Sequence, residues 1–267
     1  MNLRFFWGAS FLAFFVSFAG ARSFDGVTEP IAQAVIGMTV PGRVDSIMVS
    51  EGAFVRKGMV ILTLNKEEEQ IQVQMTHLIA ENQADLVSAQ AKMDTYKKDY
   101  FATKKLFETS NSVSEEEVWK KELDYKLAKA EFEKIQMTEE KEKLEYQMAV
   151  VQLEKRILRA PFDGEIVKIT KNTSESIEAL EPLVEIADVR FCRMTSYIYA
   201  PEARSLKTGA TVNLQLDGAK MSRYKKGRVE FISPLVDKSS LLRTVKIIFD
   251  NTDGAIEPGV TGKVRLK

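Results

Sequence analysis

The stretches GRVDSIMVSEGAFVRKGMVILTL (residues 42–64) and GEIVKITKNTSESIEALEPLVEI (residues 164–186) share one pattern of glycine and β-branched residues. A constant offset of 122 aligns them without a gap over 23 positions, so that Gly42 matches Gly164. Each stretch is typical of short strands separated by tight turns. Because such a half buries only one face, we expect the two halves to close on each other as a small β-sandwich.

The segment between these halves lacks the two strongest helix breakers. No glycine lies between Gly58 and Gly164, and no proline lies between Pro41 and Pro161. Residues 66–157 are therefore predicted to be helical.

A short polar turn divides this helical segment into two equal arms. Ser114, followed three residues later by Glu117, forms a capping box that restarts a helix. The arms 66–109 and 114–157 each have 44 residues, which corresponds to about 66 Å of helix. Equal arms joined by a short turn predict an antiparallel hairpin, whose base brings the two sandwich halves together.

Both arms carry an apolar stripe in steps of three and four, the pattern of a coiled-coil seam. In the second arm the stripe changes phase near Glu139, which indicates either a stutter or a locally polar seam. The first-arm positions are Met75, Ile79, Asn82, Leu86, Ala89, Met93, Tyr96, Tyr100, Thr103 and Phe107. The second-arm positions are Val118, Tyr125, Ala128, Phe132 and Ile135, followed by Leu144, Met148 and Val151.

The N-terminus has the pattern of an export signal. Arg4 precedes an apolar run, residues 5–18, and Ala19-Gly20-Ala21 forms a small-residue cleavage site. The 14-residue run is about 21 Å long as a helix, shorter than the roughly 30 Å hydrocarbon core of a bilayer. We therefore predict that residues 1–21 are a signal peptide, with an uncleaved inner-membrane anchor as the alternative. No cysteine follows the run, so lipoprotein anchoring is not expected.

The last segment, residues 191–267, is again rich in strand patterns. Short alternating runs are separated by turn sequences such as Asp253-Gly254. Strands at this spacing predict a small antiparallel β-barrel. The expected strands cover residues 211–216, 227–232, 244–249 and 262–266.

Composition excludes several classes of function. The chain has 38 basic and 38 acidic residues, so no basic footprint for nucleic acid is expected. One cysteine and one histidine cannot build a Cys/His zinc site or an internal disulfide. No glycine-rich phosphate loop follows a strand. We expect no cofactor, no metal site and no enzymatic activity.

Several short phrases resemble the periplasmic adaptor, or membrane fusion protein, family of bacterial efflux and secretion systems. LRAPFDG at residues 158–164 is the most typical of them. The others are PGRV at 41–44, EG at 51–52, VRKG at 55–58, LKTG at 206–209 and EPGV at 257–260. The resemblance covers essentially the whole chain after the signal.

This resemblance implies a mixed α and β fold: a split, lipoyl-like β-sandwich interrupted by a coiled-coil hairpin and followed by a β-barrel. The expected parts are a signal peptide at 1–21, a first sandwich half within 22–65 and the hairpin at 66–157. A second half at 158–190 and the barrel at 191–267 complete the chain.

The resemblance also implies a non-enzymatic periplasmic subunit that links an inner-membrane transporter, proton-driven or ATP-driven, to an outer-membrane channel. Self-association into a ring is implied as well. Many pump adaptors continue into a further membrane-proximal β domain, whereas this sequence stops at Lys267. We therefore expect either a smaller contact with the transporter or a transporter of a different class.

The hairpin tip, residues 107–114, is the implied contact with the channel. Some family members carry Arg, Leu and Ser around this turn; here Ser114 matches the serine, while Phe107 and Thr103 stand at the other two positions. Ser114 is equally well explained as a helix cap. The candidate partner-binding residues are Lys104, Leu106, Phe107, Val113 and Ser114.

Two other functions remain open at the level of sequence. Paired half-motifs also resemble biotinyl and lipoyl carrier domains, in which a modified lysine lies in the short turn that joins the halves. Here a helical hairpin replaces that turn. A purely structural envelope coiled coil is the other alternative, although it leaves the β domains unexplained.

Overall fold

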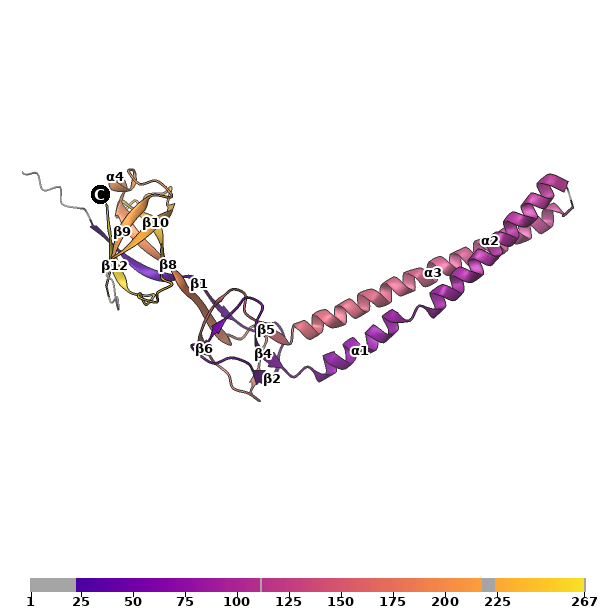
Figure 1. Ribbon diagram of the computed structural model, residues 1–267, viewed down its shortest axis with the longest axis horizontal. Helices are drawn as coiled ribbons and strands as arrows, with labels where there is room; N and C mark the ends of the chain where they lie inside the picture. Colours follow the sequence, from indigo (N-terminus) through magenta and orange to yellow (C-terminus); the bar gives the residue numbers. More distant parts are fainter. Residues whose placement is uncertain (1–22, 111, 218–223, 267) are drawn as a thin grey trace, which may run out of the picture. The chain divides into compact units, whose positions relative to one another are not determined.

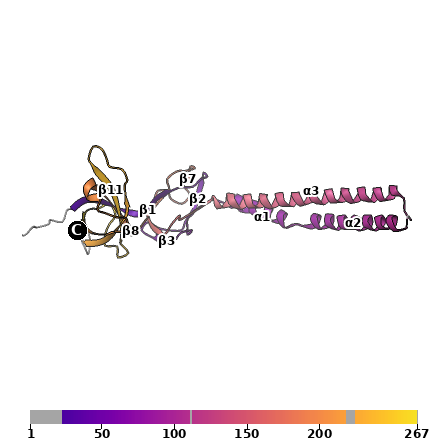
Figure 2. The ribbon, with the colours of Figure 1, turned by 90° about the horizontal axis from the view of Figure 1, so that it is seen from above.

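The computed structural model describes residues 23–110, 112–217 and 224–266. The described residues divide into two units, which we call the sandwich–hairpin unit (within residues 34–186) and the barrel unit (residues 23–33, 187–217 and 224–266). Figure 1 and Figure 2 together label their elements. The expected signal peptide, residues 1–21, lies outside the described residues.

The sandwich is built by strands from both halves of the repeat. One sheet has the order β5-β4-β2-β7, and β3 pairs separately with β6. Two of the pairings, β2 with β7 and β3 with β6, join one half to the other. The bounds are β2 Gly42–Ile47, β3 Phe54–Val55, β4 Val60–Leu64, β5 Ile157–Arg159, β6 Gly164–Ile169 and β7 Ser176–Ile177.

The sequence offset of 122 reappears as a symmetry of the hydrogen bonds. Gly42 is paired with Ile177, and the equivalent pair under the offset, Gly164 with Val55, is also formed. The Met48 N–H donates to the Ile61 carbonyl at 2.9 Å, and residues 170 and 183 repeat this bond at 2.9 Å. The two halves are therefore exchanged copies of one motif, as the sequence predicts.

The exchanged halves enclose one apolar core. Its buried members are Met38, Val44, Val55, Ile61, Leu62, Leu64, Leu158, Ala160, Ile166, Ile177, Leu183, Val184 and Ile186. Because both halves supply core side chains, neither half can bury its apolar face without the other.

The helical segment forms an antiparallel hairpin, in which α3 runs beside α1 and α2 (Figure 2). The helices are α1 Glu67–Glu81, α2 Ala84–Ser110 and α3 Glu115–Glu154. The expectation of one continuous first arm is wrong, because the arm is interrupted at residues 82–83. The Asn82 backbone is extended, and its side-chain oxygen accepts a hydrogen bond from the Ala84 N–H at 3.2 Å.

The interruption moves the seam of the first arm by one residue. Thr76 is buried in α1, whereas Met75 and Ile79, which were expected there, are exposed. Beyond Asn82 the expected positions hold, with Ala89 buried. The cause is local, because the Asn82 side chain ends one helix and caps the next.

The seam of α3 keeps one phase throughout. The residues turned inward follow alternating steps of three and four through Glu139, whose exposed fraction is 5%. Of the two interpretations left open by the sequence, the locally polar seam is therefore correct. The prediction that Leu144, Met148 and Val151 resume the seam is wrong, since all three are exposed. A hollow of about 400 Å³ beside Glu139 and Asn82 leaves room for the carboxylate.

Arg156 fixes the base of the hairpin to the sandwich. Its guanidinium lies 2.7 Å from a carboxylate oxygen of Glu69 and donates a hydrogen bond to the Pro41 carbonyl at 2.9 Å. These contacts tie both helical arms to the strand that opens the repeat.

The barrel unit is a closed antiparallel barrel. Its strand order is β1-β12-β9-β10-β11-β8, and β1 also pairs with β8. The expected strands are all formed, and the first residues of β1 join them, an addition that the sequence pattern did not predict. The bounds are β1 Ser23–Ile36, β8 Val184–Tyr199, α4 Ala200–Ala203, β9 Thr211–Leu216, β10 Tyr224–Ile232, β11 Leu242–Asp250 and β12 Thr261–Arg265.

Alternation along these strands fills the barrel interior. In β9, for example, Val212, Leu214 and Leu216 are buried, while the residues between them are exposed or half-buried. Cys192 is also fully buried, and burial raises the pKa of its thiol to about 11. Within residues 23–110, 112–217 and 224–266, no helix combines the length and apolarity needed to cross a membrane.

Candidate functional site

The tip of the hairpin is a tight turn between α2 and α3. Ser114 is the N-cap of α3, and its hydroxyl oxygen accepts a hydrogen bond from the Glu117 N–H at 3.2 Å. Three glutamates occupy the first turn of α3 and complement the positive end of the helix. The helix start predicted by the capping box is therefore formed.

Hydroxyl groups near the end of α2 bond back to its own backbone. Thr109 and Ser110 donate to the carbonyls of Lys105 and Leu106 at 2.7 and 2.9 Å, and the Ser112 hydroxyl donates to the Ser110 hydroxyl at 2.6 Å. Because these two carbonyls lie before the last four of the helix, the bonds satisfy the hydroxyl groups without adding to the helix itself. The sequence of the turn has neither glycine nor proline.

The five candidate residues play different parts at this tip. Leu106 is exposed, whereas Phe107 and Val113 are half-buried. Ser114 acts through its cap. Lys104 lies 4.0 Å from Glu108 and 5.9 Å from the ring centre of Tyr100. Leu106 is thus the most accessible of the four side chains other than the cap.

Aromatic stacking stiffens the hairpin behind the tip. The rings of Tyr100 and Tyr125 stack at 6.1 Å with planes 11° apart. Lys121 and Asp99 add an ion pair between the two helices, at 3.7 Å. The distal end of the hairpin is therefore held by contacts across the seam.

The comparisons with known proteins match both the barrel and the complete architecture. Residues 196–267 match the CusB-like, beta-barrel domain family. MacA from Actinobacillus actinomycetemcomitans has a similar structure: TM-score 0.72 and 18% identity, covering 92% of this chain and 78% of MacA. The membrane fusion protein Spr0693 from Streptococcus pneumoniae gives a TM-score of 0.58 at 14% identity, covering 92% of this chain and 99% of Spr0693. The chain has the membrane fusion protein fold.

A relative from Haemophilus influenzae, itself uncharacterized, is 23% identical over 242 residues. The match covers 90% of this chain but only 56% of that relative, so the chain spans little more than half its length.

Within this membrane fusion protein fold, two exposed aromatic residues near the tip were missed by the sequence analysis. Phe101 on α2 and Trp119 on α3 both lie outside the seam and are exposed. Trp119 starts a longer feature, a second apolar stripe along α3. The sequence signal for this stripe is a set of apolar residues in α3 that lies outside the predicted seam positions.

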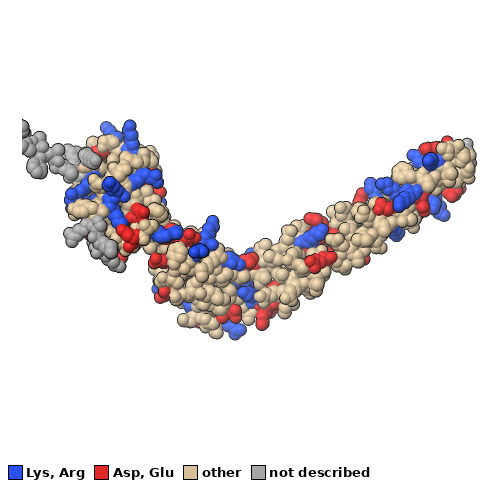
Figure 3. Space-filling view, viewed as in Figure 1, with Lys and Arg blue, Asp and Glu red and all other residues tan. Residues whose placement is uncertain are grey.

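We call this second stripe the outer stripe of α3. Leu144, Met148 and Val151 follow one another in steps of four and three, and Met137 lies seven residues before Leu144. The members are 52 to 76% exposed: Trp119, Leu123, Leu127, Met137, Leu144, Met148 and Val151. In the view of Figure 3, uncharged surface interrupts the charged side chains along the hairpin. A helix with apolar stripes on two faces is suited to pack against two neighbours.

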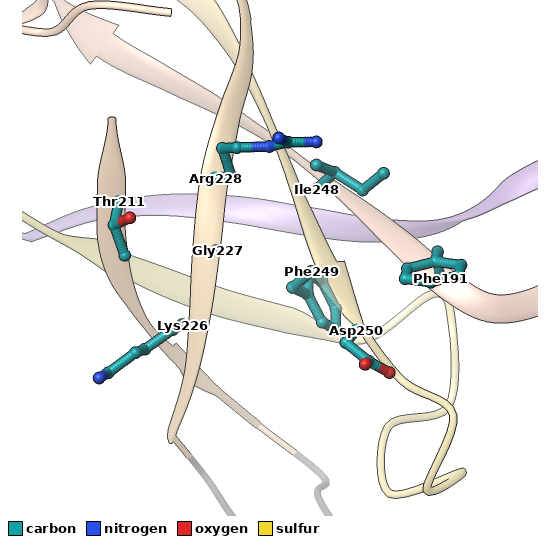
Figure 4. Close-up of a pocket in the computed structure, with 8 residues that line it drawn as sticks. All are labelled: Phe191, Thr211, Lys226, Gly227, Arg228, Ile248, Phe249 and Asp250. Atoms are coloured by element: carbon teal, nitrogen blue, oxygen red, sulfur yellow. The ribbon is translucent and has the colours of Figure 1, made fainter. Parts of the chain in front are cut away.

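A hollow of about 400 Å³ lies on the wall of the barrel unit (Figure 4). Its charged lining residues are Lys226, Arg228 and Asp250. Asp250 accepts hydrogen bonds from the N–H and hydroxyl of Thr252, at 2.8 and 2.7 Å, which hold the pKa of its carboxyl below the usual value. A carboxylate of this kind is a poor general base near neutral pH. Among the described residues, no three His, Cys, Asp or Glu side chains cluster as a metal site would require.

Proposed function

We propose that this chain is the periplasmic adaptor subunit of a bacterial tripartite efflux or secretion system. It connects an inner-membrane transporter to an outer-membrane channel, and it acts through shape and contact rather than catalysis. The barrel that matches the CusB-like family and the fold shared with MacA and Spr0693 support this assignment.

The observation that carries the proposal is the outer stripe of α3. It exposes large apolar side chains over most of a 40-residue helix, and water is a poor environment for such a surface. In our proposal the stripe packs against the hairpin of a neighbouring copy, so that several hairpins enclose a conduit.

The tip of each hairpin contacts the channel. Leu106 and Phe101 offer exposed apolar surface there, while the capped turn keeps that surface rigid. Rigidity lowers the ordering cost of binding. The carrier alternative has no comparable support, because a hairpin occupies the place of its modified turn.

A double variant tests the role of the outer stripe. Leu144→Glu with Met148→Glu places two charges on the stripe, and we expect the oligomer to dissociate with little loss of helix content. Gln136→Glu, an exposed position of α3 outside the stripe, is the matched control. Sedimentation velocity measures the assembly and circular dichroism the helix content. If the double variant and the control assemble alike, the stripe is not the contact between copies.

Crosslinking in cells tests the tip. A photoreactive residue at position 106 or 101 should trap an outer-membrane protein, whereas one at position 140, exposed on the middle of α3, should not. Adducts with cytoplasmic proteins alone would exclude the adaptor function.

A further inference from the structure

The barrel unit carries an exposed apolar surface to which the proposal above assigns no contact. The loop between β10 and β11, residues 233–241, presents Leu235, Val236 and Leu241, and Leu235 is 77% exposed. Tyr197 and Tyr199 at the end of β8 are exposed beside it. A groove of about 630 Å³ runs between the loop and Tyr197.

The 233–241 loop is held in one conformation. One carboxylate oxygen of Asp237 accepts hydrogen bonds from the N–H and the hydroxyl groups of Ser239 and Ser240, at 2.6 to 3.1 Å. The Arg243 guanidinium donates to the Ser233 carbonyl. Leu241 has φ +58°, a left-handed conformation that costs free energy for leucine. The internal bonds thus keep leucine side chains directed into solvent.

Strand register places this loop at the end of the barrel at which β1 begins, near Ser23. Leu242 is paired with Tyr199, and the Ser196 hydroxyl donates to the Asp25 carbonyl at 2.8 Å. Ser23, two residues before Asp25, therefore lies near the same end of β8 as Tyr199. In the sequence, the apolar run 5–18 ends five positions before Ser23. In the alternative in which this run stays as an inner-membrane anchor, four residues join the run to Ser23, and residue 18 lies at most about 18 Å from Ser23.

The charge of this end is mixed: Asp25, Glu202 and Asp237 lie there together with exposed basic residues, which are the groups that can face an anionic surface. Arg204, Lys207 and Lys238 are exposed around the loop and the neighbouring α4. Figure 3 shows blue side chains gathered over the barrel unit. Exposed leucines flanked by tyrosines and basic residues match the chemistry of a membrane interface, where the rings lie at headgroup level.

We propose that the 233–241 loop, with Tyr197 and Tyr199, rests in the headgroup region of an anionic phospholipid bilayer. Leu235 and Leu241 insert shallowly, and the basic residues face lipid phosphates. This contact would fix the barrel end at the membrane and is independent of what the hairpin tip binds.

A fluorescent label at position 235 tests the proposal. The full chain with Leu235→Cys is labelled with a nitrobenzoxadiazole dye; Cys192 is buried with a raised pKa, so it reacts little. The protein is reconstituted with vesicles of phosphatidylethanolamine and phosphatidylglycerol that carry a nitroxide quencher at shallow depth. We expect strong quenching at position 235, and weaker quenching in vesicles of neutral phosphatidylcholine.

A label at Thr252→Cys is the matched control, because the loop after β11 leaves the opposite end of the barrel, where Asp250 pairs with Phe191. The control should stay unquenched, and adding Leu241→Ser should reduce quenching at position 235 several-fold. Equal quenching at 235 and 252 would mean that the protein is held near the bilayer without insertion of the loop, and would overturn the proposal. Absence of quenching at both positions would also overturn it. A lipid-free spectral shift at 235 that grows with protein concentration would point to a second copy, and also overturn it. Failure of the adaptor function would leave the quenching pattern unchanged.

Discussion

At the scale of single residues, two equivalent positions of the exchanged halves share a left-handed backbone conformation but hold different residue types. Gly58 and Leu180, related by the offset of 122, have φ angles of +84° and +64°. Their N–H groups donate equivalent bonds, to the carbonyls of Ala160 at 2.8 Å and Met38 at 2.7 Å. The left-handed conformation suits glycine but costs leucine about 1–2 kcal/mol. Leu180 is 77% exposed, so core packing offsets little of that cost.

Leu180→Gly should therefore stabilise the protein. We expect the free energy of unfolding to rise by roughly 0.5–1 kcal/mol, since the flexibility of glycine in the unfolded chain offsets part of the gain. Denaturant unfolding at constant slope measures the change. Gly58→Leu, the converse change at the equivalent position, should lower stability, and a fall for both variants would contradict the strain argument.

At the scale of elements, the hairpin combines an interrupted first arm with a continuous second one. The interruption at residues 82–83 lies beside the hollow that also borders Glu139 and Glu142 of α3. Carboxylates in a seam weaken apolar packing, and a broken helix lacks backbone bonds across the break. Both features fall at the same point along the hairpin, so apolar packing and backbone bonding are both reduced there.

Glu139→Leu should strengthen the hairpin. An apolar side chain at this seam position removes the cost of desolvating a carboxylate, and we expect roughly 1–2 kcal/mol of added stability. Thermal unfolding followed at 222 nm measures it. Glu140→Leu, at the exposed neighbouring position, is the control and should change little. A destabilised Glu139 variant would show that the carboxylate holds a contact that the hairpin needs.

At the scale of the whole molecule, the titratable groups with shifted pKa values lie mostly in the barrel unit. The Arg190 guanidinium lowers the pKa of the Asp188 carboxyl, and Arg193 does the same for Glu230. A lowered folded pKa gives stability that is present above the unfolded value, about 4, and is lost as pH falls through the folded value. The raised pKa of Cys192 has the opposite sign: its contribution is present below the unfolded thiol value of about 8.5 and is lost as pH rises toward 11.

The melting temperature of the barrel unit should therefore be flat near neutral pH and fall by a few degrees below about pH 4. A second decline is expected above about pH 9. Calorimetry of the full chain across this range measures both limbs. Asp188→Asn should make the fall of the melting temperature at low pH smaller. An unchanged fall in this variant would show that Asp188 does not contribute to it.

The amino-acid sequence alone determined most features that depend on local pattern, with the break at Asn82 as the exception. The repeat at 42–64 and 164–186, the glycine-free helical segment, the Ser114 cap and the alternating barrel strands were all readable, because turn chemistry and periodicity act over a few residues. The resemblance to membrane fusion proteins followed from the same phrases. The tip turn was therefore predictable.

Tertiary structure decided which face of each helix is covered. Apolar residues such as Met75, Leu144 and Trp119 are indistinguishable in sequence from seam residues, since burial depends on the partner helix rather than on side-chain chemistry. A single asparagine, Asn82, moved the seam of α1 by one residue, and the heptad of α3 ran on through Glu139. The pairing of β1 with the barrel could not be predicted from local pattern either, because it joins residues that are more than two hundred positions apart. Our proposals rest on two surfaces, the outer stripe and the exposed loop. Both could be identified only from the tertiary structure, because it shows which apolar residues are buried in the core and which remain exposed.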